Sequence, residues 1–193
     1  MDFLKLVTEA RTCRRFEQNK PLSQEDIIWL MECVRHAPSA RNAQILRFIS
    51  ATEGSVLRNL FSLGHWAAAL KDWPGPAEGE RPTGVIATLM PMQTNAVMCY
   101  NVGIACQTIQ LAAASRGWGS CIMWTFNHDH AANLLKVPVD MQIALLVWLG
   151  VAKEIRHVEE MPSNGSYHYW RDTNGVHHVP KRSVKELLIA MYN

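Results

Sequence analysis

The sequence GVIATLMPMQTNAVMCYNVGIACQTIQLAAAS fills residues 84–115 and contains no charged side chain. A run of this kind fits either a membrane-spanning helix or elements buried inside a protein. Pro91 breaks the run, and the polar residues Asn101, Gln107 and Gln110 interrupt its second part. Alanine and glycine are plentiful where a membrane helix would carry more leucine and isoleucine. We therefore favour a strand over residues 83–90 and a buried helix over residues 95–115.

That helix has a consequence for assembly. It is apolar on nearly all sides, and a chain of 193 residues seldom surrounds a helix so completely. A second copy of the chain would supply the missing cover, so we expect a homodimer.

The remaining pattern predicts an α+β fold. Ser23 caps a helix that stops before Pro38, and Gly117 is placed for a left-handed turn after the long helix. Helices and strands alternate without regular βαβ spacing, which favours a mixed central sheet wrapped by helices, in one domain over residues 1–193. Residues 72–79 form a Pro/Gly-rich loop and candidate lid, and residues 156–181 are polar and irregular. The other expected helices are 1–10, 64–70, 129–135 and 183–191, and the other expected strands are 45–52, 121–125 and 142–149.

Composition excludes several classes of partner and site. The formal net charge of +2 is too small to indicate nucleic acid or an acidic membrane surface. The five cysteines form no CxxC pair, and residues 1–5 do not begin a signal peptide, so we expect a cytoplasmic protein. The eight histidines show no HxxxH or HExxH spacing, and we expect no structural metal.

A basic cluster near the start of the chain is the first candidate site. Arg11 and Arg14 lie three residues apart with Thr12 between them, so two guanidinium groups and a hydroxyl could converge on one phosphate. Taken alone, the cluster fits the solvated end of a basic helix better than it fits a phosphate site.

Two further segments could take part in the same site. Residues 37–44, APSARNAQ, place a proline, a serine and two amides in a loop, and amides suit the edge of a flat heterocycle. Residues 177–182, HHVPKR, present Lys181 and Arg182 before the last helix, as a second phosphate anchor or simply as surface charge. No GxGxxG, P-loop, nucleophile elbow or Ser/His/Asp arrangement appears.

Taken together and in this order, the segments resemble the FMN-dependent nitroreductase family. The likeness covers an arginine-serine-any-arginine motif at Arg11, Thr12 and Arg14, and an Ala-Pro-Ser-Ala-Gly-Asn-any-Gln stretch at residues 37–44. It continues through a long central helix with a Gly-x-Gly-Ser turn at residues 101–120, a strand ending in Leu-Gly at 149–150 and a basic pair at 181–182. It spans essentially the whole chain.

The resemblance implies a dimer with two FMN sites at the subunit interface. It implies that the phosphate is bound by Arg11, Thr12, Arg14 and Arg182, with Lys181 as a further candidate. It also implies that Pro38, Ser39 and Asn42 reach the flavin of the partner subunit, that Gln44 lies near the pyrimidine edge, and that the backbone at Met123 and Trp124 approaches the reactive face.

The chain departs from the family pattern at several positions. Arg41 replaces a glycine, Ile45 and Leu46 replace a proline and a tryptophan, and Asn101 replaces a common aspartate. A Pro-x-Glu-Gly flavin contact is missing after residue 124. The substrate pocket is therefore not located by the resemblance, and its candidate lining residues are His65, Trp66 and Trp73.

The implied reaction is ping-pong hydride transfer. NADH or NADPH would reduce the flavin and leave, and a nitroaromatic, quinone or similar acceptor would take the reducing equivalents in the same cleft. No side chain need act as nucleophile, so we name no catalytic residue. The alternatives are a flavin-binding sensor or store without turnover, a specialised flavin dehydrogenase or dehalogenase on the same scaffold, and a structural dimer whose basic clusters are surface charge.

Overall fold

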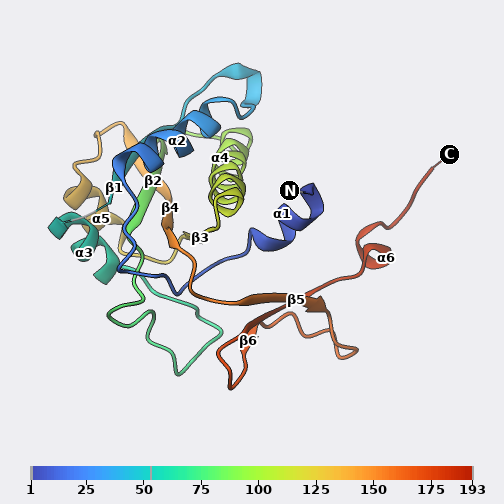
Figure 1. The fold of residues 1–193 in the computed structure, drawn as a ribbon. Helices are drawn as coiled ribbons and strands as arrows, with labels where there is room; N and C mark the ends of the chain where they lie inside the picture. The colour runs from blue at the N-terminus through green and yellow to red at the C-terminus, as the bar shows by residue number, and fades with distance from the viewer. Residues whose placement is uncertain (1, 53, 193) are drawn as a thin grey trace.

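A four-stranded sheet forms the centre of the protein, seen in a computed structural model that describes residues 2–52 and 54–192 (Figure 1). The strands lie in the order β1-β2-β4-β3, and every neighbouring pair is antiparallel. The central pair is the most apolar and the most deeply buried. The bounds are Arg47–Ala51 for β1, Gly84–Pro91 for β2, Trp118–Met123 for β3 and Met141–Val151 for β4. The predicted α+β class is confirmed, but the four strands of the central sheet are antiparallel and not mixed as expected.

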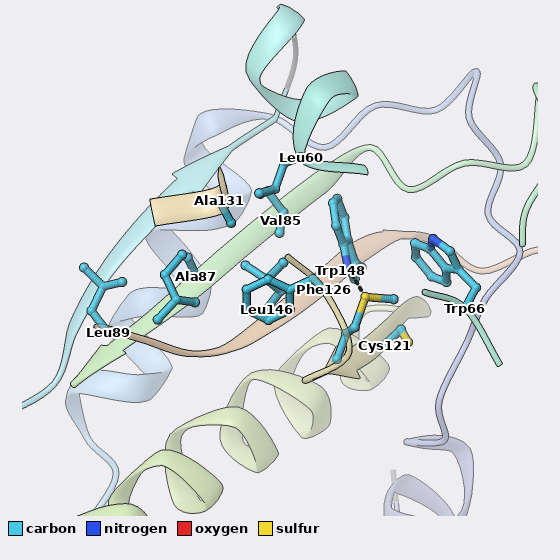
Figure 2. Close-up of a cluster of buried hydrophobic side chains, with 12 residues drawn as sticks. Leu60, Trp66, Val85, Ala87, Leu89, Cys121, Phe126, Ala131, Leu146 and Trp148 are labelled. Atoms are coloured by element: carbon cyan, nitrogen blue, oxygen red, sulfur yellow. Dashed lines mark hydrogen bonds between the residues drawn. The ribbon is translucent and has the colours of Figure 1, made fainter. Parts of the chain in front are cut away.

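Helices cover both faces of this sheet. On one face α2 (Gln24–Arg35) and α4 (Ala96–Ser115) pack Leu30 and Ile109 against the sheet. On the other face α3 (Gly54–Ser62) and α5 (His128–Leu135) contribute Leu60 and Ala131 to a second cluster around Trp148 (Figure 2). The sheet is therefore the middle layer of three.

The long helix begins and ends as the sequence predicts. The side chain of Asn95 accepts a hydrogen bond from the N–H of Met98 at the start of α4, and Gly117 has a φ of 74° after its end. In the described residues α4 alone is long and apolar enough to cross a membrane, yet it packs on α2, β3 and β4 as a core helix does. Its outer face carries Val97, Tyr100 and Ile104, residues that are 54%, 68% and 37% exposed in the single chain.

The predicted helix over residues 64–70 is wrong. The helix of this region is α3, and Gly64 pairs with Phe126 in an isolated antiparallel bridge. The N–H of His65 donates to the carbonyl of Thr125, and Ala67 has a φ of +46°. Pairing with the segment after β3 therefore outweighs the local helix propensity of the alanines.

The expectation of an irregular segment over residues 156–181 is also wrong. These residues form a small second sheet in the order β5-β7-β6, with β5 parallel and β6 antiparallel to β7. Arginine, histidine and tryptophan fill its faces, so the sequence shows no apolar period of two. The strands are β5 (Arg156–Glu160), β6 (Trp170–Arg171) and β7 (His177–Lys181).

The two ends of the chain are short helices outside the layers. The first, α1, spans Phe3–Glu9 and is capped by the side chain of Asp2, which accepts from the N–H of Lys5. The last, α6, spans only Val184–Leu187, so the predicted helix over 183–191 holds for its first turn alone. The residues after α6 extend away from the body of the molecule and bury little (Figure 1). Without a surface to pack on, their apolar side chains do not stabilise further helical turns.

Candidate functional site

The basic segment after α1 lies directly on the outer edge of the central sheet. The N–H of Cys13 donates to the carbonyl of Ser120 at 2.8 Å, and Phe16 pairs with the chain just after β4. Two glycines allow this approach, because a Cβ at Gly119 would lie 2.5 Å from Sγ of Cys13 and one at Gly150 would lie 3.0 Å from the Phe16 ring. The sheet therefore fixes the backbone that carries Arg14.

Three groups surround Arg14. The backbone N–H of Arg14 donates to Oε2 of Glu154 at 2.8 Å. Its guanidinium lies 4.7 Å above the Tyr169 ring, and Nη1 lies 3.3 Å from Nε2 of His177. The other carboxylate oxygen of Glu154 accepts from Nη2 of Arg171 at 2.5 Å, and the Glu154 side chain is fully buried. The Glu154 carboxylate therefore pairs with the side chain of Arg171, whereas it contacts Arg14 through the backbone.

The small sheet adds a row of nitrogen donors beside this group. Arg156 on β5 and Arg171 on β6 both lie directly opposite His177 on β7. Opposed residues of paired strands project from the same face, so the three side chains are neighbours. Nη1 of Arg156 also donates to the carbonyl of Glu154 at 3.1 Å. The face thus carries two guanidinium groups and one imidazole.

Burial and neighbouring positive charge shift the pKa values of two groups in this cluster. Burial, opposed by Glu154 and reinforced by the charges of Arg14, Arg171 and Arg156, lowers the pKa of His177 to about 4. Its imidazole is therefore neutral at pH 7. Burial and then the charge of Arg156 also lower the pKa of Arg11. The cluster is electropositive and partly dehydrated, which favours an anion.

A cavity of about 200 Å³ opens beside Arg14, and Met123, Trp124, His65 and Tyr169 contribute to its lining. Met123 belongs to the buried cluster around Trp148, and its Sδ accepts from Nε1 of Trp148 at 3.4 Å. Trp124 is largely exposed.

A second cavity, of about 280 Å³, lies under the loop that contains the short 3₁₀ turn η1 (Ala40–Asn42). Pro38, Ser39 and Gln44 line it together with Asn101 of α4. The N–H of Ala40 donates to Oδ1 of Asn101 at 2.9 Å, and this hydrogen bond connects the loop to α4. Three loop residues have left-handed backbones, namely Arg41, Asn42 and Gln44, with φ of 55°, 52° and 47°.

The sequence-predicted residues therefore fall into three groups. Arg11, Thr12, Arg14, Met123 and Trp124 lie along β3 and its neighbouring segment, and Pro38, Ser39, Asn42 and Gln44 lie in the loop above α4. Lys181 ends β7, and Arg182 follows it, exposed and 3.4 Å from Glu186.

Of the three residues expected to line the substrate pocket, His65 lines the cavity beside Arg14. Trp66 is instead buried in the core, 5.7 Å from Trp148 between ring centroids. The Trp73 ring lies 4.5 Å from the guanidinium of Arg171.

Sequence reasoning missed Glu154, Arg156 and Arg171, and it gave no role to His177, which it named only within the segment HHVPKR. All four lie within a polar stretch that has no motif spacing. The only sequence signal is that arginine and histidine are frequent after the last apolar strand. These residues become neighbours only when the three strands pair.

Comparison with known proteins identifies relatives of the same fold. A family model described as the nitroreductase family matches residues 7–151. Protein DrgA of Synechocystis is 25% identical over 180 residues, covering 80% of this chain and 86% of that protein. The putative NAD(P)H nitroreductase MhqN of Bacillus subtilis is 20% identical over 184 residues, covering 79% and 89%.

A solved structure of a nitroreductase with bound FMN from Desulfitobacterium hafniense superposes with a TM-score of 0.62. It is 23% identical and covers 78% of this chain and 88% of its own. The family match ends at residue 151, so β5, β6 and β7 lie beyond it.

Proposed function

The chain belongs to the nitroreductase family, and we propose that it is an FMN-dependent oxidoreductase that transfers hydride from NADH or NADPH to a nitroaromatic, quinone or similar small acceptor. FMN is bound in the related structure from Desulfitobacterium, and the Bacillus relative carries NAD(P)H in its name. Both features support the proposal for this chain.

The observation that carries the proposal is the set of hydrogen-bond donors around Arg14. Arg11, Arg14 and Arg156 have no carboxylate partner among the ion pairs of the described residues. Buried donors of this kind need an acceptor. A phosphate monoester supplies several acceptor oxygens and the opposite charge, so Arg11 and Arg14, with Thr12 beside them, would bind the phosphate of FMN.

Bound FMN would accept hydride from the nicotinamide and deliver it to the acceptor. The chain would bind and orient the cofactor, with Met123 and Trp124 approaching its reactive face. No thiolate is available at the cavity, because burial raises the pKa of Cys121 to about 12. The thiol stays protonated at neutral pH, which agrees with a reaction that needs no protein nucleophile.

A second copy of the chain would complete the site. The cavity beside Arg14 is smaller than the roughly 300–1,000 Å³ of typical ligand pockets. The exposed apolar face of α4 needs cover, and the loop with Pro38, Ser39, Asn42 and Gln44 is tied to that helix. In the homodimer this loop would reach the partner's flavin, with Gln44 at the pyrimidine edge. Lys181 remains a candidate phosphate ligand, and we expect the dimer in the cytoplasm.

An absorbance spectrum of the purified protein tests the cofactor, and anaerobic NADH or NADPH tests the reaction. We expect flavin bands that bleach with nicotinamide and return when a nitroarene or quinone is added. A colourless protein that binds no added FMN would refute the cofactor. A bound flavin that nicotinamide does not reduce would refute the oxidoreductase and favour a sensor or store.

A further inference from the structure

The face of the small sheet that meets Arg14 has donors in excess of acceptors. Among the described residues, no hydrogen-bond partner is found for four buried atoms: Nε of Arg11, Arg156 and Arg171 and Nδ1 of His177. The His177 side chain is almost completely buried. A guanidinium only donates, so Nε2 of His177 accepts from Arg14 and the ring proton lies on Nδ1. All four unpartnered atoms are therefore donors.

The charges of the same cluster are also out of balance. Glu154 is its only buried carboxylate in the described residues, and that carboxylate already accepts from Arg171 and from the backbone of Arg14. Nη2 of Arg11 donates to the carbonyl of Val7 at 3.0 Å, and Nη1 of Arg156 donates to the carbonyl of Glu154. Neither guanidinium has a carboxylate partner there. An oxyanion would satisfy the donors and the charge together.

Arg182, in contrast, lies outside this cluster of unpaired donors. It follows β7, is exposed, and lies within ion-pair distance of Glu186, a residue of the capping box that begins α6. Arg156 and Arg182 thus lie at opposite ends of the small sheet, since β5 begins with Arg156 and the parallel strand β7 ends just before Arg182.

We propose that Arg156, paired with Arg11, is the guanidinium from the C-terminal segment that binds the phosphate of the cofactor, and that Arg182 does not contact it. The donor on Nδ1 of His177 lies in the same cluster and adds a neutral hydrogen bond. The inference rests on the proposed function, because it takes the anion to be the phosphate of FMN. It assigns a binding role to a strand that the family match does not include.

Riboflavin lacks the phosphate of FMN, so a comparison of their binding affinities isolates the contribution of the phosphate. Apoprotein would be titrated with each flavin, with quenching of flavin fluorescence as the readout. We expect Arg156→Ala to weaken FMN binding about 10- to 100-fold and to leave riboflavin binding unchanged, because one charge-assisted contact is lost. Arg156→Lys should recover part of the difference. Arg182→Ala is the matched control and should bind both flavins within about twofold of the parent.

The outcomes separate the inference from the proposed function. A parent protein that binds neither flavin refutes FMN itself and the inference with it. A parent that prefers FMN, with the preference kept in Arg156→Ala or lost in Arg182→Ala, refutes only the assignment of Arg156. Equal loss of both flavins in Arg156→Ala and in the more conservative Arg156→Gln would also refute it, because the residue would then act on structure and not on the phosphate.

Discussion

Glu154 accepts a 2.8 Å hydrogen bond from the N–H of Arg14, a residue 140 positions earlier in the chain. Its other carboxylate oxygen accepts from Arg171. One buried carboxylate therefore joins the segment on the edge of β3 to the small sheet of β5, β6 and β7. The contact places the guanidinium of Arg14 beside His177 and Tyr169.

Removal of this carboxylate should destabilise the protein. Glu154→Ala leaves the mostly buried Arg171 without a counter-charge and the N–H of Arg14 without an acceptor, and we expect the free energy of unfolding to fall by about 3–5 kcal/mol. Chemical denaturation followed by circular dichroism would measure it. Glu32→Ala, which removes an exposed carboxylate of α2, is the control and should change the midpoint little.

A double mutant separates the lost ion pair from general damage. Because Glu154→Ala combined with Arg171→Ala leaves no unpaired charge, the two changes together should cost less than the sum of the single changes. Strict additivity would show that the 2.5 Å contact does not couple the two side chains.

The central layers could be predicted from sequence because local and tertiary signals agree there. The uncharged run at residues 84–115 predicted β2 and α4 to within about two residues, and Asn95 and Gly117 act as the signals at the two ends of the helix. The resemblance also expected a glycine at position 41. Arg41 has a left-handed φ of 55°, which is the physical reason that glycine suits the position.

The surroundings of the phosphate candidates could not be predicted in the same way. Arg156, His177 and Arg171 become neighbours only through the pairing of β5 and β6 with β7, and polar strands show no apolar alternation. Glu154 acts on Arg14 through a contact of long sequence separation. Such contacts form only in the folded chain, so they cannot be predicted from the spacing of residues in a motif.

The stability of the protein should fall in acid partly through Glu80. Hydrogen bonds from Arg15 and Lys153 lower the pKa of this carboxyl from 4.5 to about 2. A carboxyl with a lowered pKa stabilises the fold above its unfolded pKa, and this contribution is lost as the pH falls toward the folded pKa. We expect Glu80→Gln to be less stable than the parent at pH 6 and to lose less stability between pH 4.5 and 2.

Glu32 provides the contrast for this pH profile. Its pKa is also lowered to about 2, chiefly by Arg35, but the pair lies on the exposed surface of α2, where solvent screens it. Thermal unfolding of Glu32→Gln should follow the parent profile across the same pH range. A parallel shift in both variants would contradict the role given to the Arg15 contact.

Gly119 should not tolerate a side chain. A Cβ there would lie 2.5 Å from Sγ and 2.7 Å from Cβ of Cys13, so the segment that carries Arg14 would have to move. We expect Gly119→Ala to lower the free energy of unfolding by about 1–3 kcal/mol. Gly84→Ala, whose added Cβ would meet only ordinary contacts at 3.7 Å, is the control. Equal effects of the two variants in chemical denaturation would show that the close approach at β3 is not tight.

The exposed stripe on α4 should be the surface that a second copy covers. Val97, Tyr100 and Ile104 recur at helical spacing on its outer face. Ile104→Glu would place a charge in that interface, and we expect the dimer dissociation constant to rise at least about 10-fold, which corresponds to about 1.4 kcal/mol. Light scattering after size exclusion would measure it over a dilution series. Val139→Glu, on a fully exposed loop, should leave the dimer intact. Equal dimer fractions in both variants would place the interface on another face.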